Sequence, residues 1–247
     1  WYDDTMLAGV PAANFYASSP LVSATLDAND GIRHWRIEDG ASEHLLEGMV
    51  FGGAGTLEAP AQFLICDWLL YYPFLDGDST DAQDLTNTVT LPRYTDGVGT
   101  RAFIVAQGTG TGTGAYTLSY TNQDGVAGRT ATGSTVTPTG SGFVLSCSSG
   151  TSSQRTDPFL HMQAGDTGIR SIEQFTWTSA PGGISALVIV KPLAPLLYAE
   201  IGTVAEQVFW PRFPRVESGA YLGVLRQQTG ATPNGRTYTG LLTTIRS

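Results

Sequence analysis

Charge is scarce in this chain of 247 residues. Only 14% of the residues are charged, against roughly 25% in ordinary soluble domains. Lys and Arg number 13 against 22 Asp and Glu, which gives a net charge of −9. Because the phosphate backbone is bound by clustered Lys and Arg, the sequence predicts no nucleic-acid partner and no binding to an anionic membrane. A surface with few charges favours permanent assembly, since few charges must be desolvated when subunits meet.

Cysteine and histidine are also rare. The two cysteines, Cys66 and Cys147, have neither CxxC nor zinc spacing. Both lie in apolar, strand-like runs, so we expect buried free thiols, with one disulfide as the alternative. No histidine pair has zinc spacing, and no G-x-S-x-G elbow accompanies a candidate base, so the sequence predicts no catalytic triad. The histidines are His34, His44 and His161.

No apolar run has the length of a transmembrane helix. The best candidate, Ala61–Leu75, is shorter than the ~20 residues required and contains Asp67. No signal peptide is recognisable, and a start at Trp1 rather than Met indicates a trimmed or missing beginning. The core of the run, Phe63–Tyr72, lies between two prolines and predicts a strand buried on both faces, with a buried helix as the alternative.

Alternating apolar residues and frequent turn signals predict an all-β fold, a β-sandwich or jelly roll, with a barrel as the alternative. The residues 42–49, with Ser42 as N-cap, and 203–209 are possible short helices. The last two apolar segments, 219–228 and 236–247, fit a pair of strands or an arm. Other predicted strands are 32–37, 101–107, 115–121, 130–137, 142–148, two within 159–179 joined through Gly165–Gly168, and 184–194.

A run of alternating Gly and Thr occupies residues 108–114. A phosphate-binding Walker loop requires a following Lys and a helix whose N-terminus supplies amide donors. Here no Lys follows, and the next segment has the pattern of a strand. We therefore interpret the run as the tip of a β-hairpin that protrudes to pack on a neighbour or stays mobile, with an anion-binding nest as the minor alternative.

A long acidic loop is predicted at residues 73–100, and loops of this length are usually functional or form interfaces. Alternating carboxylates could coordinate Ca²⁺, but the EF-hand pattern fails at its sixth and twelfth positions, Asp81 and Asn87. We favour a solvated loop over a calcium site and assign no metal-binding and no cofactor-binding residue. The candidate ligands are Asp76, Asp78, Asp81 and Asp84.

No enzymatic activity is predicted, and no catalytic residue is assigned. Paired carboxylates could cleave glycosides, but the candidates are scattered along the chain. Exposed aromatic rings could bind sugars, although packing in a core or an interface is the favoured interpretation. The carboxylates are Glu38, Asp39, Glu173 and Glu206, and the aromatic residues are Tyr71, Tyr72, Trp177 and Trp210.

Two segments, Cys66–Gly99 ("CDWLLYYPFLDGDSTDAQDLTNTVTLPRYTDGVG") and Pro158–Ala194 ("PFLHMQAGDTGIRSIEQFTW…GGISALVIVKPLA"), resemble virion structural proteins of tailed bacteriophages. The resemblance spans about half of the chain, from 63 to 194. It implies a β-sandwich subunit of the particle, a homo-oligomer that contacts other virion proteins such as the major capsid protein. It favours a head decoration or cement role, with a tail, fibre or receptor-binding position as the alternative. Localisation in the virion, after assembly in the host cytoplasm, follows from the same resemblance.

Three regions are expected along the chain: an N-terminal arm with accessory strands (1–60), the sandwich core (61–200), and a C-terminal arm or strands (201–247). Residues 1–30 and 200–247 lose strand periodicity and carry prolines, so we expect extended arms that reach neighbouring subunits. These prolines are Pro11, Pro20, Pro211 and Pro214. The competing functions are a module that binds host glycans and a polysaccharide depolymerase.

Overall fold

A computed structural model shows an all-β protein. It describes residues 21–26, 61–138, 140, 142–145, 147–148, 158–198, 204–208 and 214–228, with the strand backbones at 2–3, 44–53 and 238–246. This part has no helix, is 59% strand, and its named strands pair antiparallel. The predicted all-β, sandwich-like class is therefore confirmed, while the jelly-roll order stays a prediction. The described residues accordingly include no helix that could cross a membrane.

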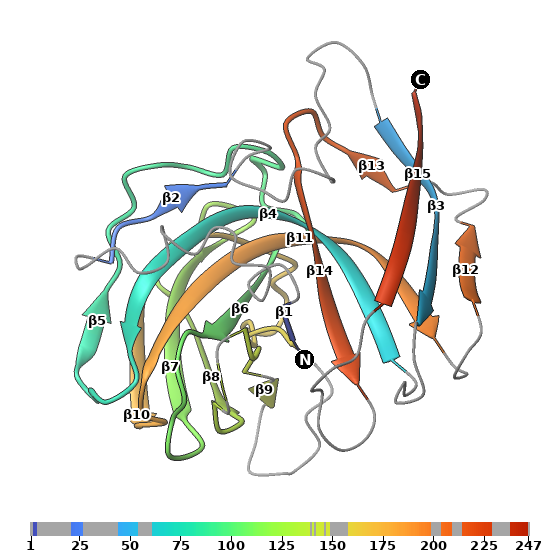
Figure 1. The fold of residues 1–247 in the computed structure, drawn as a ribbon. Coiled ribbons are helices and arrows are strands. Elements are labelled where there is room, and N and C mark those ends of the chain that lie inside the picture. The colour runs from blue at the N-terminus through green and yellow to red at the C-terminus, as the bar shows by residue number, and fades with distance from the viewer. Residues whose placement is uncertain are drawn as a thin grey trace.

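Two long strands, β4 and β11, form the spine of a central sheet. They pair along their whole length and arch across both halves of the molecule (Figure 1). On the other edge of β4, β14 pairs with its first half and β2 with its second, while β6 pairs with the first half of β11 and β1 with β14. The bounds are β1 Tyr2–Asp3, β2 Ala24–Thr25, β4 Ala61–Asp76, β6 Arg101–Ala106, β11 Ile184–Tyr198 and β14 Tyr221–Gln228.

A second sheet covers one half of the arch and completes a sandwich, in the order β5-β10-β7-β8-β9. In β7, Tyr116, Leu118 and Tyr120 are buried and alternate with half-buried Thr and Ser, as the period of two predicts. They pack with Phe175 and Trp177 of β10 in the sandwich core. The bounds are β5 Ala82–Asp84, β7 Ala115–Asn122, β8 Arg129–Thr135, β9 Cys147–Ser148 and β10 Ile169–Ser179.

A third sheet flanks the other half of the arch. Strand β3 is its centre: β15 pairs along one edge of β3, and β12 and β13 share the other. A separate core between this sheet and the central one contains Phe63 and Ile65 of β4, Leu196 of β11 and Val216 of β13. We call this half of the molecule the second lobe. The bounds are β3 His44–Gly53, β12 Val204–Val208, β13 Arg215–Val216 and β15 Tyr238–Arg246.

The central sheet is buried on both faces, as the apolar run predicted. Every residue of β4 from Ile65 to Pro73 is buried. A third cluster, which includes Trp68, Phe103 and Val188, covers the face opposite the sandwich core. Cys66 lies in that third cluster and Cys147 in the sandwich core, and both are free thiols, which confirms the expectation for the cysteines.

Several local predictions were wrong. The predicted loop 73–100 includes the end of β4 and the whole of β5. Within the possible helices at 42–49 and 203–209, the described residues 44–49 and 204–208 belong to strands β3 and β12, because cross-strand pairing overrides weak helix propensity. Residues 158–168 contain no strand. Instead they are fixed by side chains of the second sheet: the Tyr120 hydroxyl accepts a hydrogen bond from Gln163 N at 2.7 Å and donates to Asp166 Oδ2 at 2.5 Å.

The Gly-Thr run is not a hairpin tip. It connects β6 in the central sheet to β7 in the second sheet, and these strands do not pair with each other. Within its own chain the run packs on the segment before β11: Thr111 N and Gly112 N donate to Pro181 O at 2.7 and 3.1 Å. A Cβ on Gly110 would lie 2.4 Å from Pro181 O, so this close approach requires glycine.

Candidate functional site

A groove of about 370 Å³ opens where the loop after β5 crosses the second sheet. Its walls come from three segments that are distant in the sequence: the loop itself, β7 with the turn after it, and the start of β10. Small-molecule sites begin at roughly this size, ~300–1,000 Å³. The lining residues are Asn87, Val89, Thr90, Leu91, Thr95, Thr121, Gly125, Arg170 and Ser171.

The loop is fixed at its start by a buried tyrosine. The Tyr72 hydroxyl donates to Asn87 Oδ1 at 2.6 Å and accepts a bond from Ile172 N at 3.0 Å, while Asn87 Nδ2 donates to Ile172 O at 2.9 Å. Burial raises the pKa of Tyr72 well above its ordinary value, so the hydroxyl keeps its proton. The position of Asn87 at the groove is therefore set by the sandwich core.

A buried ion pair fixes the middle of the loop. Arg93 Nε and Nη2 each donate to the Asp67 carboxylate at 2.8 Å, and Nη2 also bonds Leu26 O and Trp68 O. Asp67 is fully buried and also accepts a bond from Tyr221 N at 3.1 Å. Burial raises the pKa of Asp67 to about 6, against the lowering effect of Arg93. The only indication of this ion pair in the sequence was the carboxylate of Asp67 within an apolar run.

The end of the loop lies against the second lobe. The Tyr94 hydroxyl donates to Arg215 O at 3.3 Å, and Lys191 Nζ sits 5.3 Å from the centre of the Tyr94 ring while donating to Val98 O at 2.6 Å. Burial lowers the pKa of Lys191. Lys191 lies opposite Asp67 in the central sheet, so the loop, the ion pair and this lysine occupy the junction between the two cores.

A carboxylate lies beneath one end of the groove. Glu173 Oε1 accepts bonds from Thr121 Oγ1 at 2.6 Å and Ser171 Oγ at 2.8 Å, and Thr121 and Ser171 both line the groove. Irregular register on either side of Ile172 places Ser171 beside Thr121 and Glu173 outside the regular pairing. Glu173 Oε2 is buried and has no partner among the described residues.

Arg170 supplies the positive charge of the groove. Its Nε donates to Asp96 O at 3.1 Å and its Nη2 to Gln123 O at 2.5 Å. The side chain passes between two glycines of positive φ: a Cβ on Gly97 would lie 2.7 Å from Arg170 Cγ, and one on Gly125 3.4 Å from Nη1. Within the described part of the chain the guanidinium is held by carbonyl groups and has no carboxylate partner.

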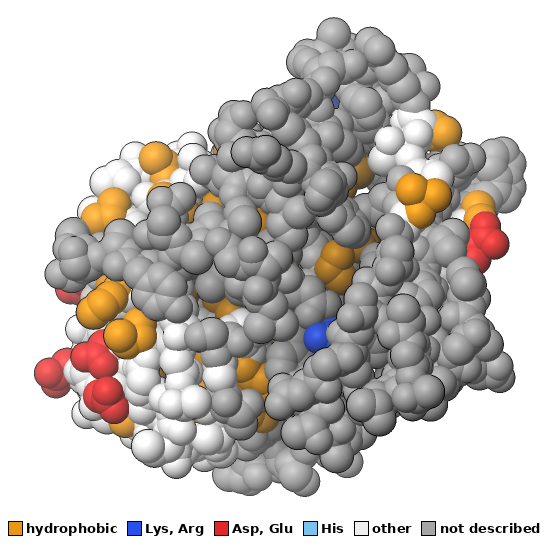
Figure 2. Space-filling view, in the orientation of Figure 1, with side chains coloured by type: hydrophobic (Ala, Val, Ile, Leu, Met, Phe, Trp, Pro, Cys, Tyr) orange, Lys and Arg blue, Asp and Glu red, His pale blue; other side chains and the backbone are white. Residues whose placement is uncertain are grey.

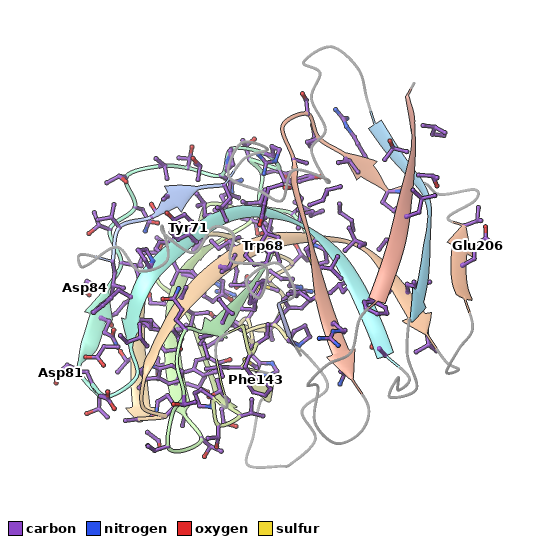
Figure 3. The ribbon with its side chains drawn as sticks, viewed as in Figure 1. Trp68, Tyr71, Asp81, Asp84, Phe143 and Glu206 are labelled. Carbon is purple, nitrogen blue, oxygen red and sulfur yellow. The ribbon has the colours of Figure 1, made fainter. Side chains whose placement is uncertain are left out.

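The four acidic residues considered as calcium ligands lie before the groove loop: Asp76 ends β4, Asp84 ends β5, and Asp78 and Asp81 lie between these strands. Asp76 Oδ1 accepts a bond from Asp78 N at 2.9 Å, and Asp84 Oδ1 accepts one from Gln174 Nε2 at 2.7 Å. Asp78, Asp81 and Asp84 are exposed. Asp81 and Asp84 lie at the end of the molecule that carries β5 (Figure 3), where Figure 2 shows a group of acidic side chains. Among the described residues no group of three or more His, Cys, Asp and Glu is placed to hold a metal ion.

The other candidates from the sequence do not converge. Glu173 lies on β10 and Glu206 on β12, at the opposite end of the molecule from Asp81 and Asp84 (Figure 3). The backbone N–H of His161 donates to the Tyr116 hydroxyl at 3.1 Å, and no hydrogen bond joins its ring to another described residue. The side chain of His44 and the residues His34, Glu38, Asp39 and Trp210 lie outside the described part.

The aromatic candidates are core residues. Tyr72 and Trp177 have no exposed area and Tyr71 is only 6% exposed, so the favoured interpretation, packing, is confirmed for these three. The groove residues Arg170, Thr121 and Ser171 were not singled out in the sequence. Thr121 and Ser171 belong to strands whose partners are not visible in a one-dimensional pattern, and only the length of the loop pointed to this region.

In comparisons with known proteins, no protein-family model, no curated protein and no solved structure matches the chain.

Proposed function

We propose that the chain is a non-enzymatic structural subunit of a larger assembly, and that this assembly is a tailed-bacteriophage particle, as the resemblance in the sequence implies. The observation that carries the proposal is a set of large aliphatic side chains left exposed on the second lobe. Leu197 of β11, Val208 of β12 and Leu241 of β15 are 67%, 53% and 62% exposed. In a chain with so few charges, such side chains favour contact with another protein.

Two of these side chains share one surface. Across β3, Leu241 and Glu206 both lie opposite Val50, and Val208 and Thr243 both lie opposite Gly48. Residues paired in this way project to the same side of a sheet, so Leu241 and Val208 belong to one face, which we call the outer face of the third sheet. Figure 2 shows apolar side chains there beside an acidic one.

A decoration or cement role fits this surface. Such a protein bridges neighbouring capsid subunits and stabilises the shell by burying area, and specific interfaces bury ~1,200–2,000 Å² in total. The proposed partners are copies of the chain itself and other virion proteins. The proposal of terminal arms that reach neighbouring subunits does not extend to the described strands of 200–247. There β14 pairs with β4, and β12, β13 and β15 form most of the third sheet, so these strands belong to the fold of their own chain.

The first test is oligomeric state, measured by size-exclusion chromatography with light scattering. We expect a stable oligomer for the unaltered chain. Leu241→Asp should weaken it on the order of tenfold or more, because a charge would be desolvated in an apolar contact. Val126→Asp is the matched control, since Val126 is 51% exposed in the sandwich half. Equal association by both variants and the parent chain would remove the outer face of the third sheet from the proposal.

The second test places the protein on the particle. Purified protein is incubated with undecorated phage heads, and the temperature at which the heads release their DNA is measured. Bound protein that raises this temperature supports the cement role, with Leu241→Asp reducing the effect and Val126→Asp preserving it. A protein that ignores heads in every condition contradicts the cement role and makes a tail, fibre or receptor-binding position the better assignment.

A further inference from the structure

We propose that the groove beneath the 87–95 loop binds a small hydroxylated carboxylate, of the class of an acidic sugar. The carboxylate of the ligand would pair with Arg170, and its hydroxyl groups would donate hydrogen bonds to Thr121 and Ser171. The inference concerns a ligand site in the sandwich half and does not depend on the assembly in which the chain resides.

Arg170 defines the anionic end of the ligand. Its Nε and Nη2 are held by two backbone carbonyls, which orient the planar guanidinium without neutralising it. Gly97 and Gly125 leave room for the side chain on either side. An arginine positioned in advance and lacking a carboxylate among the described residues is suited to bind an anion through charge-assisted hydrogen bonds.

Thr121 and Ser171 define the other end of the ligand. A hydroxyl group has one proton to donate and two lone pairs to accept with. Both protons are directed to Glu173 Oε1, at 2.6 and 2.8 Å, so the two oxygens offer only lone pairs to the groove. The ligand group that contacts these oxygens must therefore donate a hydrogen bond, and a hydroxyl group can do so without carrying a charge.

Glu173 narrows the class of ligand further. Its carboxylate lies behind the two hydroxyls, so its negative charge disfavours a dianion such as phosphate in the groove. Its Oε2 is buried and does not line the groove, so an ammonium group could not reach it directly. Val89 and Leu91 supply apolar contact for a ring face, while Thr90 and Thr95 add hydroxyl groups at the wall. A monoanion with several hydroxyls satisfies these conditions together.

The ligand-side test compares three probes by saturation-transfer NMR titration with the full chain. Methyl β-glucuronide carries both the carboxylate and the hydroxyls, methyl β-glucoside lacks the charge, and cyclohexanecarboxylate lacks the hydroxyls. We expect the glucuronide to bind at least tenfold more tightly than either of the others, since a hydrogen bond to a charged group and a set of neutral ones are each worth about that much. Equal affinities, or no binding by the glucuronide, would overturn the proposal.

Two variants separate the two ends of the groove. Arg170→Gln should bind the glucuronide and the glucoside equally weakly, because the charge that discriminates between them is gone. Thr121→Val should weaken the glucuronide several-fold while keeping its advantage over the glucoside. Arg215→Gln removes one positive charge from the second lobe and should bind as the parent chain does. If Arg170→Gln still bound the glucuronide more tightly than the glucoside, Arg170 would not be the residue that pairs with the ligand carboxylate. This would hold even if the parent chain showed the expected preference.

Discussion

At the scale of single residues, Asp67 and Arg93 matter for the position of the loop more than for stability. The carboxylate has no exposure to water, and its pKa is raised to about 6 although a guanidinium binds it through two hydrogen bonds. Desolvation therefore outweighs the ion pair in setting the protonation equilibrium. Buried pairs of this kind are often replaceable by apolar side chains, whereas removing one partner leaves a buried charge.

Arg93→Met should destabilise the fold by about 3–5 kcal/mol at pH 7, because the Asp67 carboxylate loses its only cationic partner in the described residues. A raised pKa means that the contribution of Asp67 to stability is present at low pH and lost as the pH rises through the folded-state value. The loss should therefore be smaller at pH 5 than at pH 8. Urea unfolding at both pH values measures it.

The matched variant is the double substitution Asp67→Leu with Arg93→Met, which should recover most of the lost stability and remove the difference between the two pH values. A double variant that is as unstable as Arg93→Met alone would contradict this account, since it would show that the ion pair itself stabilises the fold.

Asp166 shows the opposite behaviour. Hydrogen bonds from Arg129, and also from Tyr120 and Asn122, lower its pKa to about 2. Its contribution to stability is thus present above about pH 4, the ordinary value, and lost as the pH falls towards 2. Asp166→Asn should cost about 1–2 kcal/mol at pH 7, a modest value because the Arg129 side chain is partly exposed.

The difference between Asp166→Asn and the parent chain should shrink between pH 4 and pH 2, as thermal unfolding followed by circular dichroism would report. Asp124→Asn serves as the control, because Asp124 is exposed in the turn after β7. If the stability difference between Asp166→Asn and the parent chain stayed constant down to pH 2, the hydrogen-bonding geometry at position 166, and not the charge of Asp166, would hold residues 158–168 in place.

At the scale of elements, the sequence predicted strands well where one strand carries its own pattern. In β7 the alternation of Tyr116, Leu118 and Tyr120 predicted burial on one face, and in β4 the continuous apolar run predicted burial on both faces. Prediction from the sequence failed where the structure of a segment depends on a partner that is distant in the chain. Residues 204–208 form a strand because β12 pairs with β3. Gly110 is required by the close approach of Pro181, 71 positions later in the chain. The groove was missed for the same reason.

The contact between the Gly-Thr run and the segment before β11 gives a test with an internal control. Gly110→Ala would place a Cβ 2.4 Å from Pro181 O and 2.8 Å from Gly182 O, and should cost about 1–3 kcal/mol through forced displacement of backbone. Gly112→Ala meets nothing closer than 3.9 Å and should be neutral or slightly stabilising. Equal midpoints in urea for the two variants would contradict the packing of this loop.

At the scale of the whole molecule, β4 and β11 join two lobes that have separate cores. Ile65 belongs to the core of the second lobe and Leu69 to the sandwich core, and Asp67 lies between them on the same strand. The polar junction divides the apolar interior, yet the backbone hydrogen bonds of the central sheet continue past it. The length of β4 could be predicted from its apolar run. Its division between two cores could not, because nothing in the sequence around Asp67 indicates that Arg93 is its partner.

Continuous pairing of β4 with β11 implies that the lobes unfold together. Phe63→Ala in the second lobe and Phe175→Ala in the sandwich should each cost about 3–5 kcal/mol, as both rings are fully buried. Hydrogen exchange measured by mass spectrometry should then show that Phe63→Ala accelerates exchange in β10 as much as in β14, although Phe63 belongs to the core of the second lobe and β10 to the second sheet. Two lobes that unfold independently would instead show faster exchange in β14 alone, and the buried junction at Asp67 would then be a boundary between cooperative units.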